Sequence, residues 1–206
     1  MTVPKTSLFI TRHGFSEHNR RDDVFMGRWP ESRLTDQGRE EARQLGERLK
    51  EKNLHRLVSS SLPRTMETAQ IIAECCGITD IYPEDAFWEL SKGDWEGKKA
   101  KPLSGDDRAR ERADPFDFRY GKGGESYRDV VTRVAPVFEN WVEKFPGERL
   151  LFVLHGDVIR AVLFHLIQFP EHKIADFQTD PCSLNEFGWD GARYTILRLN
   201  DTSHIK

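Results

Sequence analysis

The segment Leu8-Phe9-Ile10-Thr11-Arg12-His13-Gly14 decides the fold class of this chain. A short apolar run that ends in polar residues and a glycine is typical of a buried β-strand. A second apolar run, over residues 150–154, ends in the same way at His155-Gly156. In an open α/β sheet, ligands bind where the strands give way to loops at their carboxyl ends. We therefore expect His13 and His155 to lie at one edge of a single sheet, with Arg12 beside them, in a site for an anion.

Strands and helices alternate along the rest of the chain. Apolar runs predict strands at residues 8–11, 57–59, near 81, 150–154, 183–189 and 193–199. Helical spacing of apolar residues and end signals predict helices over residues 35–52, 63–75, 126–145 and 157–168. This alternation favours an α/β fold, a three-layer α/β/α sandwich with a mostly parallel central sheet.

The 206 residues are enough for one hydrophobic core, so we expect a single domain over residues 1–206. Residues 98–124 are polar, contain several prolines and glycines, and show no clear periodicity. A stretch of this length inside a compact domain is usually functional. We expect it to form a cap or lid segment.

Composition narrows the range of partners. A net charge of −3 and a pI near 6.2 predict no general attraction to nucleic acid or to an anionic membrane. The sequence contains no apolar run of the ~20 residues that a membrane-spanning helix needs. Three cysteines are too few for a disulfide framework and indicate reduced thiols in a cytoplasmic protein. No residues have the spacing of a metal site, so we expect no metal and no cofactor. Nothing in the sequence indicates an oligomeric state.

Three side chains provide the chemistry of an anion site. A neutral His13 is a good nucleophile toward phosphorus, and Arg12 can hold phosphoryl oxygens through two parallel hydrogen bonds. Arg64 follows a predicted strand and lies in the first turn of a predicted helix, whose N–H groups add positive charge. His155 beside these arginines is expected to stay protonated and to donate to the phosphate. Taken singly, the same residues are also typical of an ordinary loop, an exposed arginine and a buried core histidine.

Together these residues resemble the histidine phosphatase superfamily, also called the phosphoglycerate mutase-like family. The resemblance spans residues 11 to about 187 and rests on several motifs in order. Besides Arg12-His13-Gly14, these are Leu34-Thr35-Asp36-Gln37-Gly38, Glu89-x-x-x-Gly93-x-Trp95-Glu96-Gly97, Gly124-Glu125-Ser126, His155-Gly156-Asp157-Val158-Ile159-Arg160 and Ser183-Leu184-Asn185.

The resemblance implies a role for each matching residue. His13 matches the family's nucleophile, which becomes a phosphohistidine, and Arg12, Arg64 and His155 match its phosphate pocket. Glu89 matches the usual proton donor, a role that needs a pKa raised by partial burial. The residue that matches Asn19 commonly contacts the phosphate as well. Asp94 and Glu96 are the competing candidates for the proton donor.

The residues after the second histidine indicate the reaction. Gly156-Asp157-Val158 follows His155, which resembles many phosphatases of the family, whereas its mutases usually carry Gly-Asn-Ser directly after this histidine. We therefore expect a phosphomonoester hydrolase acting on small phosphorylated metabolites. The alternatives are a phosphoglycerate mutase-type phosphotransferase and a non-catalytic protein that binds a phosphorylated ligand.

A narrower resemblance concerns residues 118–127. This segment is similar to the part of fructose-2,6-bisphosphatases whose Arg and Lys contact the second phosphate of the substrate. The similarity implies substrate contacts for Arg119 and Lys122, although an extra glycine here departs from the pattern. The other interpretation is a charged lid over a site that accepts several small phosphomonoesters. The sequence does not identify the physiological substrate.

Overall fold

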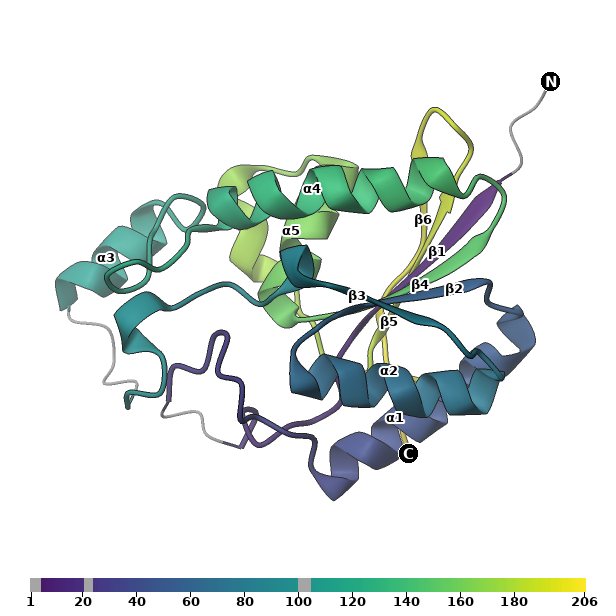
Figure 1. Cartoon of the computed structure of the whole chain (residues 1–206). Helices are drawn as coiled ribbons and strands as arrows, with labels where there is room; N and C mark the ends of the chain where they lie inside the picture. Colours follow the sequence, from purple (N-terminus) through teal and green to yellow (C-terminus); the bar gives the residue numbers. More distant parts are fainter. Residues whose placement is uncertain (1–4, 21–23, 100–104) are drawn as a thin grey trace.

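The computed structural model describes residues 5–20, 24–99 and 105–206, and a six-stranded sheet forms its centre (Figure 1). The strand order is β3-β2-β4-β1-β5-β6. Neighbouring strands pair in parallel from β3 to β1, and β5 and β6 are antiparallel additions. The strands are β1 (Thr6–Arg12), β2 (Arg56–Ser60), β3 (Ile81–Glu84), β4 (Arg149–Leu154), β5 (Leu184–Trp189) and β6 (Tyr194–Asp201). The predicted mostly parallel sheet is confirmed.

Helices cover both faces of this sheet. Figure 1 shows helices on both sides of the sheet, in agreement with the predicted α/β/α layers. One face carries α1 (Asp36–Leu49) and α2 (Pro63–Cys76), and the other carries α4 (Tyr127–Lys144) and α5 (Gly156–Ile167). None of the helices in the described part of the chain has both the length and the apolar character needed to cross a membrane.

Alternation along the central strands produces the two hydrophobic cores. Leu8 and Ile10 of β1 belong to the cluster that includes residues of α4 and α5. Phe9, which lies between them in the sequence, belongs to the cluster with residues of α1 and α2. Successive side chains of a strand point to opposite faces, so an apolar run without alternation buries both faces. The apolar run of β1 therefore places the sheet between two layers of helices.

Local sequence signals are present at the helix ends. The hydroxyl of Thr35 accepts the backbone N–H of Gly38 at 3.1 Å, which caps the N-terminus of α1. Pro63 occupies the first turn of α2, and Gly77 ends that helix with φ +68°. Ser126 and Asp129 form a reciprocal capping box at the start of α4.

One α-helix of the described residues was not predicted from the sequence. The segment over residues 98–124 contains α3 (Gly105–Ala113), whereas residues 100–104 lie outside the described part of the chain. None of the described side chains of α3 is buried. Its Asp, Arg, Ala and Glu residues include strong helix formers, but the helix has no apolar stripe for a periodicity analysis to detect. Its role as a lid remains a prediction.

The start of α1 packs so closely against the loop after β1 that Gly38 has no room for a side chain. A Cβ at Gly38 would overlap the carbonyl oxygen of Phe15 and lie 2.7 Å from its amide nitrogen. Because these are backbone atoms, they cannot rotate away. We expect Gly38→Ala to lower the free energy of unfolding by about 1–3 kcal/mol. A Cβ at Gly105 meets no atom of the described residues within 4 Å, so Gly105→Ala is the matched control in urea unfolding. Equal unfolding midpoints for the two variants would contradict the packing argument.

Candidate active site

The two predicted histidines meet at the carboxyl ends of β1 and β4. These strands are parallel neighbours, and Arg12 at the end of β1 is in register with Leu154 at the end of β4. The next residue in each chain segment is a histidine. The rings of His13 and His155 lie edge to face, with their centroids 5.4 Å apart. Topology therefore places side chains that are 142 positions apart in the sequence in one site.

The hydrogen bonds of His13 define its tautomer. Nδ1 lies 2.8 Å from the carbonyl oxygen of Gly14, and Nε2 accepts the Nε–H of Arg64 at 3.3 Å. A guanidinium nitrogen only donates, so Nε2 carries the lone pair and Nδ1 carries the proton. Burial, followed by the charges of Arg64 and Arg12, lowers the pKa of His13 well below 6.5. The ring is therefore neutral at neutral pH, with Nε2 unprotonated.

Arg64 lies at the start of α2 and is fully buried. Besides its bond to His13, it donates to the carbonyl oxygens of Gly27 at 2.9 Å and Trp29 at 3.4 Å. Burial lowers the pKa of Arg64 to about 10, so the guanidinium remains charged at neutral pH. Arg64 thereby joins His13 to the loop that follows β1.

Arg12 lies on the other side of the site with unused hydrogen-bonding capacity. Its Nη1 donates to the carbonyl oxygen of Thr179 at 2.8 Å. Its Nε is buried and has no hydrogen-bond partner among the described residues. An unpaired buried guanidinium N–H is costly, and an oxyanion would satisfy it.

One ring nitrogen of His155 is also without a partner among the described residues. The charge of the ring differs from the one that we predicted. Its Nε2 lies 2.9 Å from the hydroxyl of Ser60, and this hydroxyl also accepts the N–H of Leu62. This hydroxyl can donate its proton to Nε2, and in that tautomer the ring proton of His155 lies on Nδ1. Within the described residues, Nδ1 has no partner. Burial, followed by the charge of Arg64, lowers the pKa of His155 well below 6.5, so the ring is neutral in place of the expected imidazolium.

Glu89 is a buried carboxyl group that accepts one hydrogen bond from the described residues. Its side chain accepts the N–H of Leu90 at 2.8 Å, and the residue is 8% exposed. Burial, followed by the charge of Asp157, raises the pKa of Glu89, and Arg64 opposes this shift. The environment therefore favours the protonated acid that a proton donor needs.

The two competing proton donors are engaged elsewhere. Asp94 accepts the backbone N–H of Lys122 at 2.7 Å. Glu96 accepts the backbone N–H of Lys92 at 2.9 Å and that of Arg28 at 3.2 Å. Neither carboxylate lines the cavity described next, whereas Glu89 does.

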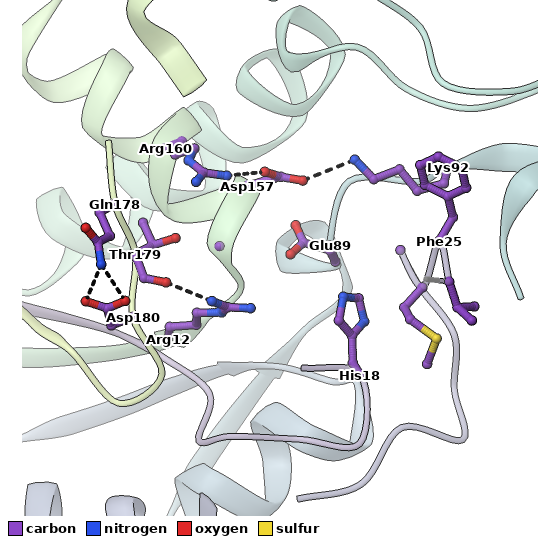
Figure 2. Close-up of a pocket in the computed structure, with 14 residues that line it drawn as sticks. Arg12, His18, Phe25, Glu89, Lys92, Asp157, Arg160, Gln178, Thr179 and Asp180 are labelled. Carbon is purple, nitrogen blue, oxygen red and sulfur yellow. Dashed lines mark hydrogen bonds and ion pairs between the residues drawn. The ribbon is translucent and has the colours of Figure 1, made fainter. Parts of the chain in front are cut away.

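A cavity of about 420 Å³ opens beside these residues (Figure 2). Two of the residues that line it, Arg12 and Glu89, were predicted from the sequence as site residues, and the others were not. Its lining consists of Arg12, His18, Val24, Phe25, Met26, Gly27, Glu89, Lys92, Gly156, Asp157, Arg160, Gln178, Thr179 and Asp180. Figure 2 shows Glu89 and His18 facing each other across its centre. Asp157 and Arg160 belong to a motif quoted above, so the sequence contained a signal for these two positions but not for their contacts with Lys92 and with each other.

Three predicted contact residues lie away from this cavity. Asn19 uses its side-chain oxygen to accept the N–H and the hydroxyl of Ser16, both at 2.9 Å. Arg119 forms an ion pair of 2.7 Å with Asp129 and its side chain is 61% exposed. Lys122 is exposed. The structure therefore does not bring Asn19, Arg119 or Lys122 to the cavity, and their proposed contacts remain predictions.

Buried neutral histidines make stability depend on pH. Burial and the charge of Arg64 lower the pKa of His18 to about 3, and the pKa values of His13 and His155 are also lowered. Above pH 6.5 neither the folded nor the unfolded chain protonates these rings. Below it the unfolded chain takes up protons first, so folding is destabilised by up to about 1.4 kcal/mol per pH unit and ring. We expect a lower urea midpoint at pH 5.5 than at pH 7.5, with a weaker pH dependence in His18→Gln. Identical midpoints at both pH values would contradict neutral burial.

Comparison with known proteins places this site in a family. Residues 8–202 match the histidine phosphatase superfamily (branch 1). Phosphoglycerate mutase-like protein 4 from Arabidopsis thaliana is 30% identical over 209 residues, covering 99% of this chain and 89% of that protein. YhfR from Bacillus stearothermophilus is 29% identical, with a TM-score of 0.86 and coverage of 98% and 100% of the two chains. A phosphoserine phosphatase from Entamoeba histolytica, in complex with phosphoserine, shares the fold at 21% identity, a TM-score of 0.86 and the same coverage. With a family match over nearly its whole length, the chain belongs to branch 1 of the histidine phosphatase superfamily.

Proposed function

We propose that this protein is a phosphomonoester hydrolase that acts on small phosphorylated metabolites through a phosphohistidine on His13. The observation that supports this most is the unprotonated Nε2 of His13, fixed by Arg64 and by the carbonyl of Gly14. An imidazole nitrogen held in this state is ready to attack phosphorus without prior loss of a proton. The Entamoeba enzyme in complex with phosphoserine has the same fold and a ligand of this substrate class.

In the first step, Nε2 of His13 attacks the phosphorus in line and the P–O bond to the alcohol breaks. Glu89 gives its proton to the leaving oxygen and becomes a carboxylate. The guanidinium groups of Arg12 and Arg64 and the Nδ1–H of His155 stabilise the charge on the equatorial oxygens. The unpaired Nε of Arg12 and the unpaired Nδ1 of His155 support this assignment, because an equatorial oxygen would satisfy both.

In the second step, the Glu89 carboxylate takes a proton from a water molecule. The water oxygen attacks the phosphorus and the bond to His13 Nε2 breaks, which releases inorganic phosphate. Glu89 is protonated again and His13 returns to its neutral tautomer. The raised pKa of Glu89 suits both halves of the cycle, since the group must be an acid first and a base afterwards.

A phosphoglycerate mutase-type phosphotransferase is the second candidate, and the name of the Arabidopsis relative favours it. Such an enzyme would pass the phosphoryl group from His13 back to a substrate instead of to water. It would then depend on a bisphosphorylated primer. A purely ligand-binding role has less support. The lowered pKa of His13 and the raised pKa of Glu89 suit a nucleophile and a proton donor. The unpaired nitrogens of Arg12 and His155 can bind the oxygens of the transferring phosphoryl group.

The proposal is tested by trapping the intermediate. Protein is mixed with a ³²P-labelled phosphomonoester, quenched within milliseconds under alkaline conditions and digested. We expect an acid-labile label on the peptide that contains His13, with stoichiometric release of inorganic phosphate. In parallel, 3-phosphoglycerate is supplied with and without 2,3-bisphosphoglycerate. Isomerisation that requires the primer and outpaces phosphate release would favour the mutase, and absence of any label on His13 would refute both reactions.

A further inference from the structure

Glu89, the proposed proton donor, lies in a segment without regular secondary structure. Residues 88–92 connect the short 3-10 helix Asp85–Phe87 to the short 3-10 helix Gly93–Trp95 and belong to neither. Buried backbone carbonyls need hydrogen-bond donors, and a segment outside helices and strands must obtain them from elsewhere. The position of the Glu89 carboxyl group therefore depends on the side chains that bind this segment.

Two arginines donate to the carbonyl oxygens of this segment. Arg133 of α4 donates through Nη1 to Ala86 at 2.6 Å and through Nη2 to Trp88 at 2.7 Å. The carbonyl oxygen of Glu89 itself accepts Nη2 of Arg133 at 3.3 Å and Nε of Arg28 at 3.0 Å. Arg28 comes from the loop that follows β1, so two elements far apart in the sequence hold the backbone of Glu89.

The carboxylate of Glu125 joins the two arginines. Its Oε1 lies 2.7 Å from Nη2 of Arg28 and 2.9 Å from Nε of Arg133. Its Oε2 accepts the backbone N–H of Ser91 at 3.0 Å, and its own backbone N–H donates to the carbonyl oxygen of Ser91 at 2.9 Å. Burial opposes ionisation, but the hydrogen bonds from Arg133 and Ser91 lower the pKa of Glu125 on balance, so this group is a carboxylate at neutral pH. Glu125 thus holds the segment directly, through Ser91, and indirectly, through both arginines.

These three side chains contact the segment that carries Glu89 without lining the cavity of the candidate site. Arg28, Glu125 and Arg133 are not among the residues that line the cavity of about 420 Å³, whereas Glu89 is. Their side chains are only 17–29% exposed. Charge-assisted hydrogen bonds between such sheltered groups are short and directional. We therefore expect any effect of these residues on the reaction to pass through Glu89.

We propose that Arg133, Glu125 and Arg28 are positioning residues for the proton donor, because they fix the backbone of Glu89 and thereby aim its carboxyl group at the leaving oxygen. The inference rests on the proposed function, in which Glu89 protonates that oxygen. A displacement of about 1 Å between reacting groups can slow a reaction about 10²-fold. A reaction that needs no proton from Glu89 should be insensitive to the three residues.

Two esters with different leaving groups test the proposal. The alcohol of glycerol 3-phosphate must be protonated as it leaves, whereas para-nitrophenolate needs little protonation. The value of kcat/KM reports the phosphorylation step, in which this difference matters. We expect Arg133→Gln to lower kcat/KM for glycerol 3-phosphate about 10- to 100-fold, and to change it for para-nitrophenyl phosphate by no more than about threefold. Inhibition by inorganic phosphate should stay at the wild-type level.

A double-mutant cycle distinguishes positioning from general damage to the structure. If Arg133 acts through Glu89, the ratio of the two kcat/KM values in Glu89→Gln/Arg133→Gln should equal the ratio in Glu89→Gln alone. General damage would lower both kcat/KM values alike and leave the ratio at its wild-type value. Arg28→Gln is the second variant, which loses one hydrogen bond to Glu89 and the ion pair with Glu125. We expect it to shift the ratio in the same direction, and it decides the question if Arg133→Gln does not fold.

The matched control is Arg128→Gln. Arg128 lies on the same helix as Arg133 and forms ion pairs with Asp117 at 2.6 Å and Glu171 at 3.2 Å. Its side-chain hydrogen bonds in the described structure go to these two carboxylates and not to residues 86–91. The substitution removes the same charge from α4, and we expect it to preserve the wild-type ratio.

Amide hydrogen exchange tests the same contacts without turnover. The N–H of Leu90 donates to the Glu89 carboxyl group, and the N–H of Ser91 donates to Glu125. We expect both amides to exchange about tenfold faster in Arg133→Gln, and at wild-type rates in Arg128→Gln.

The outcomes separate the positioning role from the hydrolase. If the wild-type protein hydrolyses both esters but neither arginine variant changes their ratio, or if the two substitutions act additively, the positioning role is refuted and the hydrolase stands. If the wild-type protein hydrolyses neither ester, the hydrolase proposal fails. Faster exchange in Arg133→Gln then still supports the placement of Glu89 by these residues, and unchanged exchange refutes it.

Discussion

His13→Ala is expected to lower kcat by about four to six orders of magnitude and to abolish the labelled phosphoenzyme. The substitution removes the nitrogen that forms the covalent bond, while Arg12, Arg64 and His155 can still bind phosphate. Affinity for inorganic phosphate should therefore change much less than turnover. The measurement is release of para-nitrophenol and inorganic phosphate under saturating substrate.

Loss of folding must be separated from loss of the nucleophile. The ring of His13 is 2% exposed and accepts a hydrogen bond from Arg64, so alanine leaves that donor unpaired. His13→Gln is the matched variant, because its side-chain oxygen can still accept from Arg64 but cannot form a stable phosphoryl intermediate. We expect both variants to be equally inactive and the glutamine variant to unfold at a higher urea concentration. Turnover of either within tenfold of the wild-type rate would assign the nucleophile elsewhere.

The sequence predicts the layers of this fold well because its signals are local. An apolar run such as residues 150–154 fixes a strand buried on both faces, and Thr35 or Gly77 fixes a helix end through one hydrogen bond or one φ angle. The helix α3 was not predicted because it buries none of its described side chains. Periodicity reports burial, and a helix that lies on the surface has no such signal.

The same distinction between local signals and long-range contacts applies to the candidate site. His13 and His155 could be predicted to meet because each ends a strand, and neighbouring parallel strands bring their carboxyl ends together. The contact between Lys92 and Asp157 joins residues 65 positions apart in the sequence, and no local pattern specifies it. The neutral state of His155 depends on burial and on the hydroxyl of Ser60, which only the folded arrangement provides.

Glu89→Gln is expected to lower kcat for an alkyl phosphate such as glycerol 3-phosphate by about 10²–10⁴, the usual contribution of a positioned general acid. The amide is nearly isosteric and its oxygen can still accept the N–H of Leu90, so the fold should be retained. The loss should be smaller for para-nitrophenyl phosphate, whose leaving group needs little protonation. Asp94→Asn is the matched control, since Asp94 was a rival proton donor that lies outside the cavity.

The pH profile provides a second, independent readout of Glu89. Its folded pKa is raised above the usual value of 4.5, and the first step needs the protonated form. The value of kcat/KM should therefore decline as the pH rises through this pKa, at a higher pH than an exposed glutamate would give. His13 adds no acid limb near pH 6.5, because its own pKa is lowered and Nε2 stays free of a proton. In Glu89→Gln the alkaline limb should disappear, whereas Asp94→Asn should retain it. A limb that persists in the glutamine variant would transfer the role of proton donor from Glu89 to another group.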